Sequence, residues 1–271
     1  MTRIFEALRK VQVARPAPAP VEAPTPAAAA VPASPAARSL PANVVRLAEA
    51  RVPALELLPA PALPEEFVVE LTHLRYALES ALTGKACRVV AVASAQPHEG
   101  STTVALSLAR VLSQDPSLRV LLVDTHVRRA GVAAALGLKA DATLRDLLAG
   151  HSDVARHIVV VERRNLRVLC ARADATGGTS FPIGDLREFL AAASSAYDWV
   201  ILDTAPVLEN ADAAAVASLA DGVVMVLRAG RTKRPVVARA ATVLQKANAR
   251  VLGSVLNRRR LEIPEFIYRR I

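Results

Sequence analysis

Apolar runs that alternate with segments of helical periodicity constrain the fold of this chain most strongly. The runs cover Arg88–Ser94, Arg119–Asp124, Asp198–Asp203, Gly222–Arg228 and Arg250–Leu256, with helices expected near 65–82, 101–113, 185–196, 211–219 and 233–248. Strands that are apolar on both faces and separated by helices are typical of a parallel sheet covered on both sides. Residues 155–170 add one or two further strands. The expected fold class is α/β, a mostly parallel sheet with helices on both faces.

Composition divides the chain into four parts. Residues 1–14 are expected to form a short amphipathic helix, because Ile4, Phe5, Leu8 and Val11 share one of its faces. Residues 15–64 hold 12 of the 18 prolines, mostly among alanines, which predicts an extended and disordered linker. A globular domain is expected over 65–257, followed by a basic tail over 258–271. A short helix on a long tether favours docking to a partner or a membrane.

Charge and apolar patterning exclude several classes of protein. No stretch of 18 apolar residues lacks charges, so no transmembrane helix is expected, and the first residues lack the apolar core of a secretory signal. Cys87 and Cys170 each lie in an apolar strand-like run, which favours two buried, reduced thiols and a cytoplasmic location. The formal charge of +9 permits contact with nucleic acid or anionic lipid without indicating either. For the basic tail, a solvated segment and a binding segment both stay open.

A loop between the first strand and its helix carries the pattern of a phosphate-binding loop. The strand over 89–94 runs directly into Ala95–Thr103 and then into a helix, so backbone amides and the helix N-terminus could hold phosphates. The standard pattern ends Gly-Lys-Ser/Thr, but Ser101 stands at the lysine position and brings no positive charge. His98 stands where glycine is preferred, at a backbone angle that costs other residues about 1 kcal/mol. On this loop alone, an ordinary turn capped by Ser101 or Thr102 remains equally open.

Two aspartates strengthen the phosphate-loop interpretation. Asp124 ends the second of the apolar runs named above, and Asp203 ends the third. Carboxylates at the carboxyl ends of parallel strands beside a phosphate loop are placed to contact Mg²⁺, directly or through water. One such aspartate is usually a helix cap or a turn residue, but two in this order favour a nucleotide site.

These motifs resemble the cytoplasmic bacterial tyrosine kinases of capsule and exopolysaccharide synthesis, which are relatives of the MinD/ParA-type P-loop ATPases. The family pattern Ser-Ala-x-Pro-Gly-Glu-Gly-Lys-Ser-Thr is similar to Ser94–Thr103 at seven of its nine specified positions. The pattern Leu-Leu-x-Asp-x-Asp-x-Arg-Arg is similar to Leu121–Arg129, and Tyr-Asp-x-x-Ile-x-Asp-Thr-x-Pro-Val is similar to Tyr197–Val207. The opening residues Thr2–Lys10 look like the start of stand-alone members. The resemblance covers nearly all of the chain outside the linker.

The departures from the family pattern are concentrated at its chemistry. Ser101 replaces the loop lysine, and His126 replaces the second aspartate of the Asp-x-Asp motif. The tyrosine-rich tail is reduced to Tyr268. The helix motif for oligomer formation, Glu-x-x-Arg-x-x-Arg, falls on Val69, Thr72 and Arg75, so only its last position matches. Because phosphoryl transfer depends on cancelling charge, these losses indicate a pseudokinase.

The resemblance nevertheless implies a residual site. It places nucleotide binding at Gly100, Ser101, Thr102, Thr103 and Asn257, Mg²⁺ at Thr102, Asp124 and Asp203, residual catalysis at Asp124 and Asp203, and the phosphorylation candidate at Tyr268. ATP and Mg²⁺ are expected to bind weakly, and no structural cofactor is expected.

The function implied is a regulatory or binding module in exopolysaccharide synthesis and export, at the inner face of the plasma membrane. The expected partner is the cytoplasmic segment of a membrane-embedded polysaccharide co-polymerase. Whether the chain also forms a homo-oligomer is left open, and no nucleic acid is expected as a partner. Two alternatives stay open. One is an active ATP-dependent tyrosine autokinase, with Lys85, Arg128 or Arg129 as a substitute cation. The other is a positioning ATPase of the MinD/ParA type, whose extra signature lysine would fall at Gln96.

Overall fold

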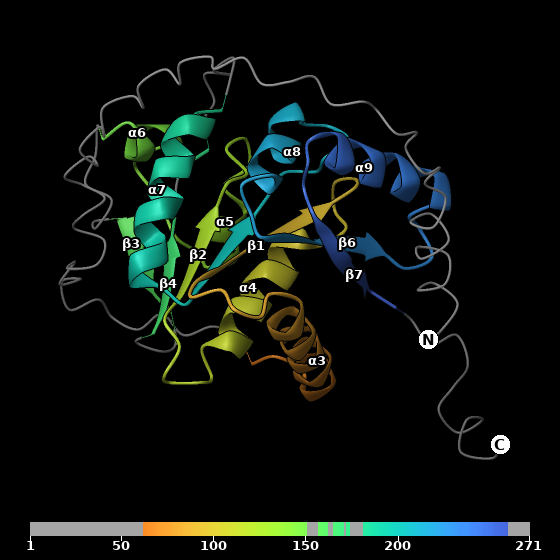
Figure 1. The fold of residues 1–271 in the computed structure, drawn as a ribbon, viewed down its shortest axis with the longest axis horizontal. Helices are drawn as coiled ribbons and strands as arrows, with labels where there is room; N and C mark the ends of the chain where they lie inside the picture. The colour runs from red at the N-terminus through yellow and green to blue at the C-terminus, as the bar shows by residue number, and fades with distance from the viewer. Residues whose placement is uncertain (1–61, 151–156, 162–164, 171, 174–180, 260–271) are drawn as a thin grey trace, which may run out of the picture. The chain divides into compact units, whose positions relative to one another are not determined.

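The computed structural model describes residues 62–150, 157–161, 165–170, 172–173 and 181–259 (Figure 1). Its helices are α3 Glu65–Ala81, α4 Ser101–Leu112, α5 Gly131–Ala135, α6 Leu144–Leu148, α7 Ile183–Ala196, α8 Ala211–Ala217 and α9 Arg234–Lys246. Its strands are β1 Arg88–Ser94, β2 Val120–Asp124, β3 Ile158–Val160, β4 Leu166–Leu169, β5 Trp199–Asp203, β6 Gly222–Arg228 and β7 Val251–Asn257. The expected N-terminal helix, the linker up to residue 61, and the tail from residue 260, with Tyr268, lie outside the described residues.

The seven strands form one sheet in the order β3-β4-β2-β5-β1-β6-β7. All neighbours pair in parallel except β3 and β4, which are antiparallel. The prediction of a mostly parallel sheet is therefore confirmed. After β1 the chain builds β2 on one side, with β5 later inserted between them, and it adds β6 and β7 on the other side. The order thus reverses at β1, and open α/β sheets bind ligands outside the carboxyl ends of the strands at such a point.

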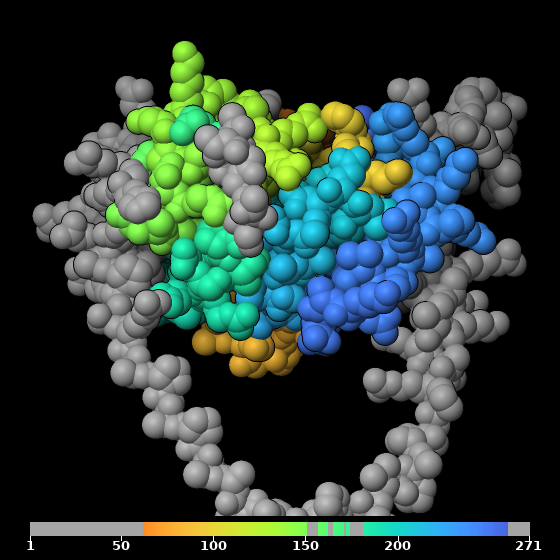
Figure 2. Space-filling model, turned by 90° about the horizontal axis from the view of Figure 1, so that it is seen from above, coloured from red at the N-terminus to blue at the C-terminus, as the bar shows by residue number. Residues whose placement is uncertain are grey.

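Helices cover both faces of the sheet (Figure 1). One core contains the buried side chains of α3, α4 and α5, including Leu71, Leu108 and Val132. The other contains those of α6 to α9, including Leu147, Phe189 and Leu244. Figure 2 shows this second face, on which α7, α8 and α9 lie next to one another, from teal through cyan to dark blue. Both cores consist mainly of Val, Leu and Ala, as expected for a chain with 3% aromatic residues.

Two features of the fold were not predicted. The five-residue helices α5 and α6 are too short to show a 3.6-residue period in the sequence. The α6 helix begins at a capping box, in which Thr143 and Asp146 each bond the backbone N–H of the other. The short strand β3 lies at one edge of the sheet and pairs antiparallel with β4.

Other features agree with expectation. Cys87 and Cys170 are both free and buried, as predicted. Within the described part of the chain, no helix is long and apolar enough to cross a membrane.

Candidate nucleotide site

The phosphate loop spans residues 95–100, between β1 and α4. Its backbone takes left-handed angles at His98, with φ of 62°, and at Gly100, with φ of 97°. A side chain at Gly100 would collide with the amide group of Asn257, so both the angle and the close approach require glycine there. The sequence-based expectation that His98 occupies a strained position agrees with its positive φ.

The start of α4 offers free backbone donors. The N–H groups of Ser101, Thr102 and Thr103 donate to no acceptor among the described residues, and the N-cap Gly100 makes no side-chain cap. The positive end of the helix dipole adds to these donors, which makes the position suitable for an anion. Ser101 is neutral and only partly exposed, so the loop contributes amides but no side-chain charge at this point.

Asp124 and Asp203 are register partners at the ends of β2 and β5. The Asp124 carboxylate accepts the backbone N–H of His126 at 3.0 Å and that of Val132 at 2.9 Å. The carboxylate of Asp124 thus binds the backbone at both ends of the loop over 126–132. Gly131 lies against Thr102 in this arrangement, where an added Cβ would lie 3.0 Å from the Thr102 hydroxyl oxygen.

Asp203 is fully buried, and neither carboxylate oxygen has a hydrogen-bond partner among the described residues. Burial, and then the charge of Asp124, raise the pKa of Asp203 well above its ordinary value, while the Thr102 hydroxyl acts in the opposite direction. Burial also raises the pKa of Asp124 to about 6, although its two backbone hydrogen bonds lower it. Two buried carboxylates without a cation are costly, so a positive ion between them and Thr102 would remove the penalty.

Mg²⁺ fits this set of donors. It prefers a few carboxylate or hydroxyl oxygens and keeps several waters, and Asp203, Asp124 and Thr102 supply only hard oxygens. None of the ion pairs between described residues involves either aspartate. The structure thus brings Asp124, Asp203 and Thr102 together at the start of α4, and their binding of Mg²⁺ stays a prediction.

His126 does not replace the missing carboxylate. Burial, followed by the charges of Arg129 and Arg128, lowers the pKa of His126, so its imidazole is neutral at pH 7. A neutral imidazole can accept a proton but does not supply the negative, hard oxygen that Mg²⁺ prefers.

The candidate substitute cations lie in different places. Lys85 forms an ion pair with Asp221 at 2.8 Å, before β1 and β6 begin, and so lies at the opposite edge of the sheet from the phosphate loop. Its suggested role as a substitute is wrong for that reason. Arg128 and Arg129 are exposed on the loop that follows β2, close enough for their charges to act on His126.

Asn257 lies on the other side of the phosphate loop. Its Nδ2 donates to the Glu99 carbonyl at 2.9 Å, and its Oδ1 accepts the Arg258 N–H at 2.8 Å. The adenine contact expected of Asn257 stays a prediction, while its contact with the loop is direct. Sequence reasoning missed Glu99, whose carboxylate accepts two amides of the loop. The sequence did carry a signal for Glu99. An acidic residue inside a loop that binds anions needs hydrogen-bond donors of its own, which indicates a structural role in the loop.

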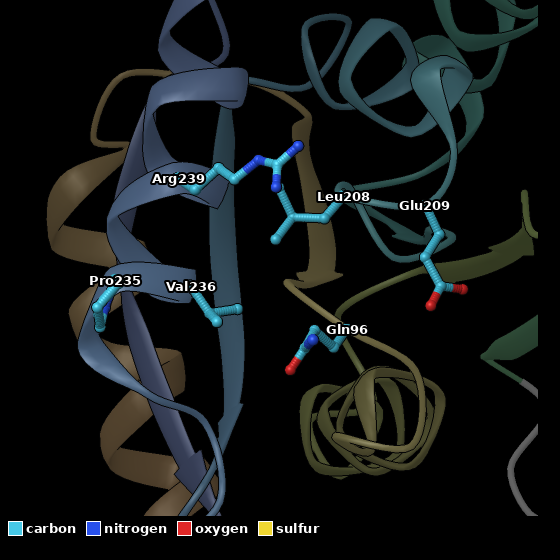
Figure 3. A pocket seen from close by; sticks show the side chains of 6 residues that line it. All are labelled: Gln96, Leu208, Glu209, Pro235, Val236 and Arg239. Atoms are coloured by element: carbon cyan, nitrogen blue, oxygen red, sulfur yellow. The ribbon is translucent and has the colours of Figure 1, made fainter.

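A hollow of about 400 Å³ adjoins the loop (Figure 3). It is lined by Gln96 from the loop, Leu208 and Glu209 from the segment after β5, and Pro235, Val236 and Arg239 from α9. Arg239 extends toward Leu208, and the carboxylate of Glu209 points away from Leu208 (Figure 3). Gln96 occupies the position of the signature lysine of the positioning ATPases and brings no charge into this hollow.

Comparison with known proteins identifies the family. The model for the AAA domain matches residues 87–251. The tyrosine-protein kinase YwqD of Bacillus subtilis is 31% identical over 198 residues, which cover 69% of this chain and 79% of that protein. The chain belongs to the bacterial tyrosine-kinase family.

Two further proteins extend the comparison. The succinoglycan biosynthesis transport protein ExoP of Rhizobium meliloti is 31% identical over 201 residues, which cover 71% of this chain but 25% of that protein. The kinase domain of the Escherichia coli tyrosine kinase Etk superposes with a TM-score of 0.63 at 22% identity, over 78% of this chain and 94% of that domain. The expected P-loop fold is thus confirmed, and so is membership of the kinase family.

Proposed function

We propose that this chain is a degenerate member of the tyrosine-kinase family that acts as a regulatory or binding module in exopolysaccharide synthesis and export. The observation that carries the proposal is the absence of a positive side chain at the lysine position of the loop. The amides at 101–103 donate to no acceptor among the described residues, and Asp124 and Asp203 end neighbouring strands, which supports retained binding. The loop residue that would neutralise phosphate is serine.

The intact parts define what the site can bind. The free amides at the start of α4 would hold phosphate oxygens, and Thr102, Asp124 and Asp203 would hold Mg²⁺. Bound Mg²⁺ would neutralise charge between neighbouring phosphates. Nucleotide binding is thus retained in weakened form, because the helix terminus supplies partial charge where the family has a full one.

The missing parts define what the site cannot do efficiently. Transfer of a phosphoryl group requires positive charge on the transferred group and a carboxylate that orients the attacking hydroxyl. With Ser101 at the lysine position, the loop supplies no positive side chain. The neutral imidazole of His126 does not supply the carboxylate. Each loss alone could be offset, but both fall on the same reacting group.

The proposed partner is the cytoplasmic segment of a membrane-embedded polysaccharide co-polymerase, which would hold the chain at the inner face of the plasma membrane. ExoP, whose name describes succinoglycan biosynthesis and transport, includes a segment similar to this chain within a protein about four times longer than the match. Such an arrangement supports a role for this domain beside a transport component.

Self-assembly of the chain through α3 has less support than the co-polymerase partner. Arg75, which matches the family's assembly motif, donates to Glu79 at 2.8 Å and to Asp115 at 3.2 Å within its own chain. Its guanidinium group is therefore already engaged in holding α3 against the turn after α4.

The two alternatives differ in what they require. An active autokinase would need a cation from Arg128, Arg129 or a second chain at the phosphate. A positioning ATPase would need the signature lysine, but Gln96 stands there. Among the described residues, no lysine or arginine shifts the pKa of Asp124 or Asp203, and Gln96 is neutral, so neither alternative gains support.

Genetic complementation tests the proposal. In the native host, a strain that lacks the gene should regain exopolysaccharide with the unmodified protein and equally with Tyr268→Phe, because a binding module does not depend on phosphorylation of its own tail. The protein level of each variant is measured as a control. If Tyr268→Phe is expressed normally but restores no polysaccharide, the autokinase alternative is favoured instead.

A further inference from the structure

A buried carboxylate lies inside the phosphate loop. Glu99 is 3% exposed, and its Oε2 accepts the backbone N–H of Ala95 at 2.7 Å and that of Gln96 at 3.0 Å. An anionic acceptor makes stronger hydrogen bonds to amides than a neutral one does. The side chain thereby satisfies the first two donors of the loop from within the loop itself.

The other oxygen of Glu99 connects the loop to the turn after β6. Thr232 donates its hydroxyl to Oε1 of Glu99 at 2.5 Å, and the same hydroxyl oxygen accepts the backbone N–H of Arg228 at 3.0 Å. Glu99 and Thr232 are 133 positions apart in the sequence. The bond therefore joins the loop after β1 to the turn after β6, the strand that pairs with β1 in the sheet.

The backbone of Glu99 connects the loop to the end of β7. Asn257 donates to the Glu99 carbonyl at 2.9 Å, while its own oxygen is held by the Arg258 N–H. Gly100 provides the space that this contact needs, because a Cβ there would overlap the Asn257 amide. The end of β7 is thus fastened to the residue that precedes α4.

We infer that Glu99 is the positioning residue of the phosphate loop, and that Glu99, Thr232 and Asn257 form a latch that sets the loop's shape from β6 and β7. His98 and Gly100, which take left-handed angles, lie between the two amides that Glu99 binds and the start of α4, so the latch holds the loop on both sides of them. It also takes Ala95 and Gln96 out of the set of free amides. Among the described residues, the N–H groups of residues 98–100 and of 101–103 donate to no acceptor, so an anion is directed to the later part of the loop and the start of α4.

This inference rests on the proposed function in one respect only, namely that the ligand of the loop is a nucleotide. The latch itself is a property of the loop and is measured without any ligand. Two sets of measurements on the full chain separate the two claims, namely amide hydrogen exchange without nucleotide and a titration with ATP and Mg²⁺.

Hydrogen exchange tests the latch. Glu99→Gln keeps the size of the side chain but removes its charge, so the amides of Ala95 and Gln96 should exchange at least about tenfold faster. Thr232→Val should also speed their exchange, by about three- to tenfold, whereas Thr232→Ser keeps the hydroxyl and should restore protection. Glu70→Gln on the exposed side of α3 and Thr242→Val on α9 are matched controls, for which no change is expected.

The titration tests what the latch does for binding. Glu99→Gln and Thr232→Val should weaken ATP–Mg²⁺ binding by about three- to tenfold, and Thr232→Ser should not. Unchanged exchange at Ala95 and Gln96 in both Glu99→Gln and Thr232→Val overturns the latch. Faster exchange with unchanged affinity overturns its role in placing the ligand. If the unmodified protein binds no nucleotide, the proposed ligand is wrong, and the exchange result still decides the latch.

Discussion

At the scale of single residues, two positions separate the site from the family pattern, Ser101 at a helix terminus and His126 after β2, and the first of them removes a positive charge. Ser101 lies beside amides that are ready for an anion, but it contributes no cation. We expect Ser101→Lys to tighten ATP–Mg²⁺ binding by roughly 1–3 kcal/mol, about 5- to 150-fold, the scale of a hydrogen bond to a charged group. Calorimetric titration measures this directly, with Gln114→Lys, an exposed side chain after the far end of the same helix, as the control. Equal affinity of the unmodified protein and Ser101→Lys would show that the missing lysine is not what weakens the site.

The buried aspartates give the protein a dependence on pH. Their pKa values are raised, so the folded chain binds protons more tightly than the unfolded chain does. Without a cation, the free energy of unfolding should therefore fall as pH rises from about 4 through 6. Asp203→Asn removes a buried charge that makes no hydrogen bond among the described residues, so it should stabilise the cation-free protein at pH 8 by about 1–3 kcal/mol.

Urea unfolding in EDTA at pH 5 and pH 8 measures the effect of Asp203→Asn. The gain should be smaller at pH 5 and should diminish when Mg²⁺ is added at pH 8. Asp141→Asn, on an exposed side chain, is the control. A loss of stability in Asp203→Asn at pH 8 would mean that the carboxylate is satisfied in a way that the geometry does not show.

At the scale of elements, the sequence predicted what periodicity can reveal. The strands β1, β2, β5, β6 and β7 and the helices α3, α4, α7, α8 and α9 lie within two residues of their expected bounds, because each is long and apolar enough to show its period. The short helices α5 and α6 were missed for lack of length. At the site, Asp124 and Asp203 were singled out because strand ends meet at one edge, and Thr102 because of its place in the family's loop pattern. The Glu99–Thr232 contact could not be found, since it spans 133 positions and follows no pattern.

Docking of α3 is an element-scale property that mutation can test. Leu71 is 2% exposed in the core beneath α3 and α4, whereas Val69, two positions earlier on the same helix, is 48% exposed. Leu71→Ala should lower the free energy of unfolding by about 2–4 kcal/mol, as loss of a packed leucine does. Val69→Ala should change it by less than about 0.5 kcal/mol. Urea denaturation compares the two, and a similar small loss in both would show that α3 is not an integral part of the domain.

At the scale of the whole molecule, the expected N-terminal helix at 1–14 and the linker at 15–64 stay predictions. If the helix serves to recruit the domain to a partner or membrane, deleting residues 1–14 should leave the melting temperature of the described domain nearly unchanged while weakening association with the export machinery. Differential scanning calorimetry and membrane fractionation measure the two effects. A fall of several degrees on deletion would show that this segment packs on its own domain.

The central claim is that the chain keeps the kinase fold but has lost phosphoryl transfer. The most direct test incubates the purified full-length protein with ATP and Mg²⁺ and measures phosphotyrosine by mass spectrometry, beside Asp203→Ala under the same conditions. We predict no phosphate at Tyr268, and none elsewhere above the level in Asp203→Ala. Phosphate that accumulates on Tyr268 with time and disappears in Asp203→Ala would contradict the claim and establish an active autokinase.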